Sequence, residues 1–150
     1  MKLEKYNLVK DAANFTYDFY SEGPNGRIKK VVRFQHMPKI SENVFNLAFG
    51  DLDEETGLID DLVISNNNDR LKVLKTVAEA VADFIKFRPK AIILIKGSTL
   101  SRTRLYQMGM SFFWLEISQL YEIYGNLGRE WLPFRKGVNY ERFMIFKKIK

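Results

Sequence analysis

The sequence predicts an α+β fold in which two main helices pack on a mostly antiparallel β-sheet. Three observations support this prediction. Residues 14–65 show the alternation of strands, two helical stretches follow, and a continuous apolar run at residues 91–95 separates them. The expected order is four strands, a helix, a strand, a helix and two strands, within a single domain of 150 residues.

The first four strands are expected to form two hairpins. Aromatic residues alternate with polar ones from residue 14 to residue 21, and the sequence Gly-Pro-Asn-Gly at residues 23–26 is typical of a hairpin turn. Residues 27–37 continue as a strand with apolar side chains on one face and cations on the other. Residues 44–49 and 58–65 are expected to form the second hairpin.

The first helix is expected to begin at residues 66–69, because Asn and Asp side chains cap the free amides of a first turn. It should end before Pro89. Its core-facing residues recur at spacings of three and four and are Leu74, Val77, Val81 and Ile85. The next strand, at 91–95, is expected to pair in parallel with the strand at 58–65 through a right-handed crossover.

The second helix, expected at residues 100–120, carries two apolar stripes and is followed by closing strands at 121–126 and 140–147. The stripe expected to face the core consists of Leu105, Met108, Phe112 and Leu115. The other consists of Met110, Phe113, Trp114 and Ile117. Either the C-terminal segment 127–139 or a second copy of the chain can cover it, and we favour a homodimer.

Composition excludes several classes of chemistry. The chain has no cysteine and one histidine, His36, so disulfides, thiolate metal sites and cysteine nucleophiles are excluded. His36 is expected to be a partly buried structural residue. No apolar signal core follows Met1, and the stretch at 105–115 is too short to cross a bilayer, so we expect a cytoplasmic protein. We predict no cofactor and no bound metal.

The net charge of +6 is distributed unevenly, with basic ends around an acidic middle. Such a surplus favours phosphate-bearing partners, nucleic acid included. The strongest candidate site is the beginning of the second helix. Its unpaired first-turn amides attract anions, and hydroxyls, a glycine and two arginines lie beside them. Its residues are Gly97, Ser98, Thr99, Ser101, Arg102 and Arg104. Either a bound anion or an internal carboxylate, such as Asp51, Asp60 or Asp61, can offset the two cations.

Two further clusters of polar side chains are weaker candidates for a site. Polar residues before the first helix can support a ligand or a magnesium ion, or can serve only as a cap and loop. They are Asp60, Asp61, Asn67, Asn68 and Asp69. Arg27, Lys29 and Arg33 share one strand face near Tyr20, which suits single-stranded nucleic acid but is also common on solvated sheets.

The run Gly97-Ser98-Thr99, followed by Arg102-Thr103-Arg104-Leu105-Tyr106, resembles a family of uncharacterised small proteins found mostly in Bacteroidetes and in related phages. The likeness covers nearly the whole chain and implies a fold but no activity. The order of elements is also similar to that of the acyl-CoA N-acyltransferases, in which a Gly-rich loop before the first helix holds CoA. Here that loop would be residues 66–70, which contain no glycine.

Two functions follow from these observations. The first is a non-catalytic binding module that engages an anionic partner, such as nucleic acid or another phosphate-bearing ligand, at the beginning of the second helix. The alternative is an enzyme like the acyltransferases, active or degenerate. The sequence leaves open whether the protein is an enzyme.

Overall fold

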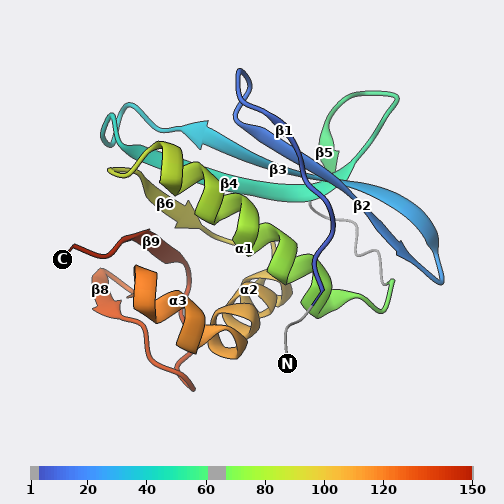
Figure 1. Cartoon of the computed structure of the whole chain (residues 1–150). Helices are drawn as coiled ribbons and strands as arrows, with labels where there is room; N and C mark the ends of the chain where they lie inside the picture. Colours follow the sequence, from blue (N-terminus) through green and yellow to red (C-terminus); the bar gives the residue numbers. More distant parts are fainter. Residues whose placement is uncertain (1–3, 61–66, 150) are drawn as a thin grey trace. The chain divides into compact units, whose positions relative to one another are not determined.

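The computed structural model describes residues 4–60 and 67–149. The chain forms two compact units, one made of residues 1–35 and 48–84 and the other of residues 36–47 and 85–150. Strand β4 (Val44–Leu52) and helix α1 (Arg70–Phe87) contribute to both units (Figure 1). Most strand pairs are antiparallel, which confirms the α+β prediction, although the described residues contain three helices rather than two.

The first unit contains an antiparallel sheet of the order β1-β2-β3, formed by β1 (Val9–Asp11), β2 (Thr16–Gly23) and β3 (Gly26–His36). The predicted hairpin is confirmed, with Gly23 opposite Gly26 at its tip. Gly26 has a φ of +89°, which glycine adopts without strain. Strand β5 (Ile59–Asp60) pairs with the end of β4. The rest of the predicted strand 58–65, from residue 61 on, lies outside the described residues.

Helix α1 lies along one face of this sheet (Figure 1), where its Phe84 ring contacts the rings of Phe15 and Phe34. Leu74, Val77 and Val81 are each 6% exposed, which confirms the predicted core-facing stripe. The rings of Phe34 and Phe84 stack with their centroids 4.1 Å apart. The helix ends at Phe87, before the predicted Pro89 stop.

Side-chain hydrogen bonds hold Asn67 and Asp69, which precede α1, in place. The carboxylate of Asp69 accepts hydrogen bonds from the hydroxyl of Tyr6, at 2.6 Å, and from that of Ser21. The side-chain amide of Asn67 donates to the Ser21 hydroxyl at 3.1 Å and to the carbonyl of Gly26 at 2.9 Å. Because these partners belong to β2, β3 and the N-terminal segment, the network joins the beginning of α1 to the hairpin.

We expect the Tyr6→Phe substitution to lower the free energy of unfolding by about 1 kcal/mol at neutral pH, because it removes the bond to Asp69. Burial, followed by that hydrogen bond, raises the pKa of Tyr6 above its usual 10.0. The fold therefore favours the neutral phenol, and this stabilisation is present below pH 10 and is lost as the pH rises through the raised pKa.

Urea unfolding of both proteins at neutral pH and above the usual tyrosine pKa tests this expectation. The stability difference between wild type and Tyr6→Phe should shrink at alkaline pH. An equal difference at both pH values would contradict the role assigned to Tyr6.

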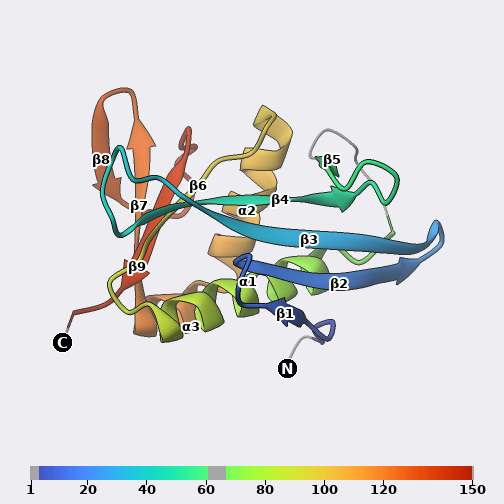
Figure 2. The same ribbon diagram turned by 90° about the horizontal axis from the view of Figure 1, so that it is seen from above.

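The second unit is built on a sheet of the order β4-β6-β9-β7-β8 (Figure 2). Its strands are β6 (Ile92–Ile95), β7 (Tyr121–Leu127), β8 (Glu130–Pro133) and β9 (Phe143–Lys147), together with the first half of β4. Here β6 pairs in parallel with β4. The prediction that residues 91–95 pair in parallel with residues 58–65 was therefore wrong. The described strand of that segment, β5, pairs antiparallel with β4.

Strand β8 was missed by the sequence analysis and forms the end of this sheet. It follows β7 through a two-residue turn in which Gly128 has a φ of +60°. The Phe134 amide donates to the carbonyl of Ile123. Neighbouring residues of a strand alternate in direction, so the imino nitrogen of Pro133 lies on the open side of β8 and carries no hydrogen.

The second predicted helix is divided into α2 (Leu100–Phe112) and α3 (Trp114–Leu120) at Phe113. This division turns Phe113 inward, 7% exposed, whereas Phe112 and Leu115 are 57% and 78% exposed. The expected core stripe through Leu105, Met108, Phe112 and Leu115 was therefore wrong. The inward residues of α2 are Thr103, Tyr106, Gln107, Gly109 and Met110.

The other stripe is largely covered by its own chain. Met110 and Phe113 are buried, and the ring of Trp114 lies 5.1 Å from that of Phe134, in the segment that we considered as an internal cover. A search of the helices among the described residues finds none long and apolar enough to cross a membrane.

Candidate functional site

Hydrogen bonds from backbone amides to threonine hydroxyls hold the turn from β6 into α2. The amide of Gly97 donates to the Thr103 hydroxyl at 3.1 Å, and the Thr99 hydroxyl caps α2 by accepting from the amide of Arg102 at 3.2 Å. A Cβ atom on Gly97 would lie 2.4 Å from the Thr103 nitrogen. Glycine is thus required here by the close approach of the helix.

The arginines of the predicted anion site differ in their surroundings. The guanidinium of Arg104 donates to the carbonyl of Tyr140 at 2.7 Å and to the Gln107 side chain at 2.8 Å. Two neutral oxygens therefore engage one nitrogen, Nη1, of the Arg104 guanidinium, and whether an anion binds here stays a prediction. Arg102 is half-buried, whereas Ser98 and Ser101 are exposed. Of the six predicted residues, Gly97, Thr99 and Arg104 hold α2 in place.

The polar residues predicted to support a ligand lie around the beginning of α1 and on β5. Asn67 and Asp69 belong to the network described above, and Asn68 adopts a φ of +56°. Asp60 lies opposite Asp51 in the β4–β5 register, and Asp61 falls outside the described residues. Among the residues that the structure describes, no group of three or more acidic or histidine side chains could hold a metal ion.

The three cations of β3 lie on one face, as predicted, but only two of them face acidic partners. Arg27 lies 3.8 Å from Glu22 and stacks on the Tyr20 ring, with its guanidinium carbon 3.8 Å from the ring centroid. Lys29 lies 3.7 Å from Asp18. These pairs form because the β2–β3 register places acidic residues opposite or diagonal to both cations.

Arg33 is the exception. The register places Thr16 directly opposite it, and the diagonal carboxylate, that of Asp18, lies 3.7 Å from the Lys29 ammonium instead. Within the described part of the chain, the half-buried guanidinium of Arg33 makes no ion pair or hydrogen bond. None of its five N–H donors is therefore used by a residue that the structure describes.

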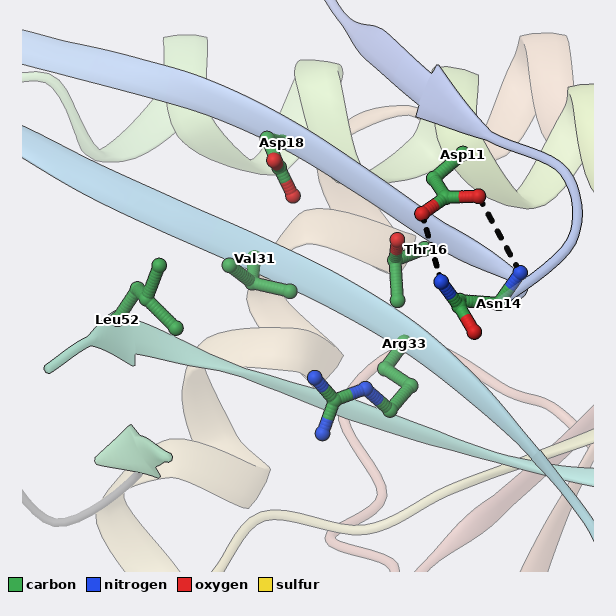
Figure 3. A pocket seen from close by; sticks show the side chains of 7 residues that line it. All are labelled: Asp11, Asn14, Thr16, Asp18, Val31, Arg33 and Leu52. Atoms are coloured by element: carbon green, nitrogen blue, oxygen red, sulfur yellow. Dashed lines mark hydrogen bonds between the residues drawn. The ribbon is translucent and has the colours of Figure 1, made fainter. Parts of the chain in front are cut away.

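Arg33 lines a hollow of about 450 Å³ on this face of the sheet (Figure 3). Asp11 and Asn14 close one side, where the Asp11 carboxylate accepts from the Asn14 side-chain amide at 2.8 Å. Figure 3 shows the Arg33 guanidinium extending away from that pair, toward Val31 and Leu52. The full lining consists of Asp11, Asn14, Thr16, Asp18, Val31, Arg33 and Leu52.

The polar groups of the hollow are mixed in charge. Asp18 is shared with Lys29, and Asp11 is engaged by Asn14, so the two carboxylates already have donors. In the register, Thr16 lies between Asp11 and Arg33. The arrangement presents one guanidinium and one hydroxyl to a ligand, over a floor that includes the buried Val31.

Lys30 is an unusual residue that the sequence analysis did not single out. Its ammonium lies 2.5 Å from the Asp51 carboxylate, and its side chain is only 9% exposed. The signal was present in the sequence, because Lys30 shares the apolar strand face of Ile28, Val32 and Phe34. A lysine on the apolar face of a strand indicates a buried acidic partner, because a charged side chain is rarely buried unless it is paired.

His36 is exposed at the end of β3, not partly buried as expected. Its ring nevertheless has partners, because Nε2 lies 2.9 Å from the carbonyl of Glu42 and the ring stacks on Phe45. Both contacts are those of a structural residue.

Comparison with family models gives one informative match. The model described as a family of unknown function, DUF6934, matches residues 2–148. Comparisons with curated proteins and with solved structures gave no match. The predicted likeness to an uncharacterised family is confirmed in this form, and the likeness to acyltransferases stays a prediction.

Proposed function

We propose that this chain, which belongs to the DUF6934 family, is a non-catalytic binding module that takes an anionic group of its ligand on Arg33. The observation that carries the proposal is that the Arg33 guanidinium lines the hollow of the first unit and has no ion-pair or hydrogen-bond partner among the described residues. A guanidinium binds carboxylate or phosphate through two parallel hydrogen bonds, and a half-buried one gains more from such a partner than one in water.

The mixed charge of the hollow favours a single anionic group over a polyanion. Glu22 and Asp18 already accompany the other two cations of β3, and Asp11 lies at the rim. A nucleic acid strand would bring its phosphates close to these carboxylates. We therefore infer a ligand with one carboxylate or phosphate and a neighbouring group that hydrogen-bonds to Thr16.

The lining also favours binding over catalysis. Its two acidic side chains, Asp11 and Asp18, already have partners in Asn14 and Lys29, and it contains neither histidine nor lysine as an alternative base. The beginning of α2 remains a second place where an anion can be tested. There, however, Thr99 already caps one first-turn amide and Arg104 is bound to carbonyl groups.

Titration of the ¹⁵N-labelled protein with inorganic phosphate and with acetate, followed by NMR, tests the proposal. We expect the amide signals of Thr16, Asp18 and Arg33 to shift in a saturable way. The Arg33→Gln substitution should weaken this binding by at least about tenfold, because it removes a charge-assisted pair.

The matched control is Arg27→Gln, which removes the same charge from the same strand face but from a residue with its own partners. It should leave the titration unchanged. Shifts confined to residues 98–102, an absence of shifts with either anion, or equal losses in both variants would each contradict the Arg33 site. Tighter binding to a single-stranded RNA than to phosphate, lost equally in both variants, would indicate a polyanion partner instead.

A further inference from the structure

The sheet of the second unit buries one of its faces within its own chain. The side chains on this inner face include Ile93, Ile123, Phe143 and Ile145, all at most 6% exposed. The Phe143 ring lies against Phe134 and Tyr140, in the segment between β8 and β9. Residues that alternate with these side chains must point to the opposite face.

That opposite, outer face is also apolar. The register aligns Leu94, Met144 and Tyr124 in one row across β6, β9 and β7. The neighbouring row contains Ile92 and Phe146, and the rings of Tyr124 and Phe146 stack at 5.8 Å. All five side chains are half-buried. An antiparallel sheet with a solvated face normally carries polar residues there, so this face is typical of a contact surface.

Opposite charges lie at the two ends of this apolar block. Glu122 is opposite Phe146, in the row that also contains Ile92, and its carboxylate makes no ion pair or hydrogen bond among the described residues. At the other end, Arg142 lies over the Trp131 ring, 5.4 Å from its centroid, and donates to Asn126 at 3.3 Å. Arg142 precedes Phe146, the neighbour of Glu122, by four residue steps, which corresponds to about 13 Å along an extended chain.

We propose that this outer face binds the same face of a second copy of the chain. A two-fold axis perpendicular to the strands, passing through the row of Leu94, Met144 and Tyr124, reverses the strand direction. It then brings Glu122 close to Arg142 of the partner subunit, and does the same for the symmetry-related pair. Because the charges are complementary only in this antiparallel arrangement, they favour one self-complementary dimer.

This surface differs from the stripe from which the sequence predicts a dimer. Two members of that stripe, Met110 and Phe113, are buried in their own chain. The inference is also independent of the Arg33 hollow, which lies in the first unit.

A charge-exchange series tests the dimer by analytical ultracentrifugation from low micromolar to submillimolar concentration. Wild type should be in monomer–dimer equilibrium. Glu122→Lys should weaken the dimer by about tenfold, because it places two cations together at each end of the contact. Arg142→Glu should weaken it similarly, and the double variant Glu122→Lys/Arg142→Glu should restore it.

Glu116→Lys, an equal charge change on the exposed side of α3, is the control and should leave the dimer unchanged. Met144→Lys, which places a charge in the central row, should abolish the dimer, and thermal unfolding of each variant verifies its fold. The proposal is overturned by a wild type that stays monomeric or by a double variant as weak as the single ones. It is also overturned if only Phe112→Ala or Leu115→Glu, on the exposed side of α2 and α3, disrupts the dimer.

Discussion

Replacing Lys30 by methionine is expected to lower the free energy of unfolding by about 3–5 kcal/mol, the largest effect that we predict for a single charged residue. The substitution leaves the Asp51 carboxylate, 15% exposed, without the ammonium that lies 2.5 Å from it. It also leaves Asp51 directly opposite Asp60 across the β4–β5 pair. A largely buried carboxylate that loses its cation is destabilising, because burial has already removed part of its hydration.

Urea unfolding measures the loss, and the neighbouring residue provides the control. Lys29 is paired with Asp18 at 3.7 Å, but these side chains are 26% and 31% exposed. Lys29→Met should therefore cost less than about 1 kcal/mol. The double variant Lys30→Met/Asp51→Leu should recover most of the stability, because it removes both charges together. Equal losses for Lys29→Met and Lys30→Met would show that burial of the Lys30 pair is unimportant.

Substitution of Gly97 by alanine is expected to destabilise the protein by about 3 kcal/mol, near the upper end of ordinary overpacking. The new Cβ would meet the Thr103 nitrogen at 2.4 Å and the carbonyl carbon of Arg102 at 2.7 Å. Both are backbone atoms of the first turn of α2, so no side-chain rotation relieves the contact. The bond from the Gly97 amide to the Thr103 hydroxyl would be displaced as well.

Thermal and urea unfolding distinguish this structural role from a ligand-binding one. The adjacent Ser98 is exposed, and Ser98→Ala should change the stability by less than about 0.5 kcal/mol. If Gly97→Ala kept wild-type stability while losing phosphate-induced NMR shifts at residues 98–102, the glycine would instead serve the approach of an anion, as the sequence first indicated.

Periodicity predicted those parts of the fold in which one face of an element is buried and the other is solvated. The spacing of Leu74, Val77 and Val81 in α1 is of this kind, whereas β3 buries the consecutive residues Lys30, Val31 and Val32. Periodicity failed where both faces of an element carry apolar residues. The stretch 100–120 contains two apolar stripes, and only the division at Phe113 determines which aromatic side chain turns inward.

The candidate site was predictable only in part, for a similar reason. The sequence places Arg27, Lys29 and Arg33 on one face, which the structure confirms. It does not reveal that Thr16, and not an acidic residue, lies opposite Arg33, because this depends on the register of two strands. Likewise, the sequence does not reveal that the Gly97 amide donates to Thr103 and that Arg104 donates to the Tyr140 carbonyl.

The proline at the end of β8 limits how copies of this chain can meet. An unprotected edge strand offers a row of unpaired amide hydrogens to which a strand of another copy can pair. Repeated pairing of this kind produces fibrils. On β8, Pro133 interrupts that row within a strand of four residues. Growth of the sheet by strand addition is therefore hindered at this edge. In the proposed dimer, by contrast, each copy uses its one outer face, so a third copy finds no free surface of the same kind.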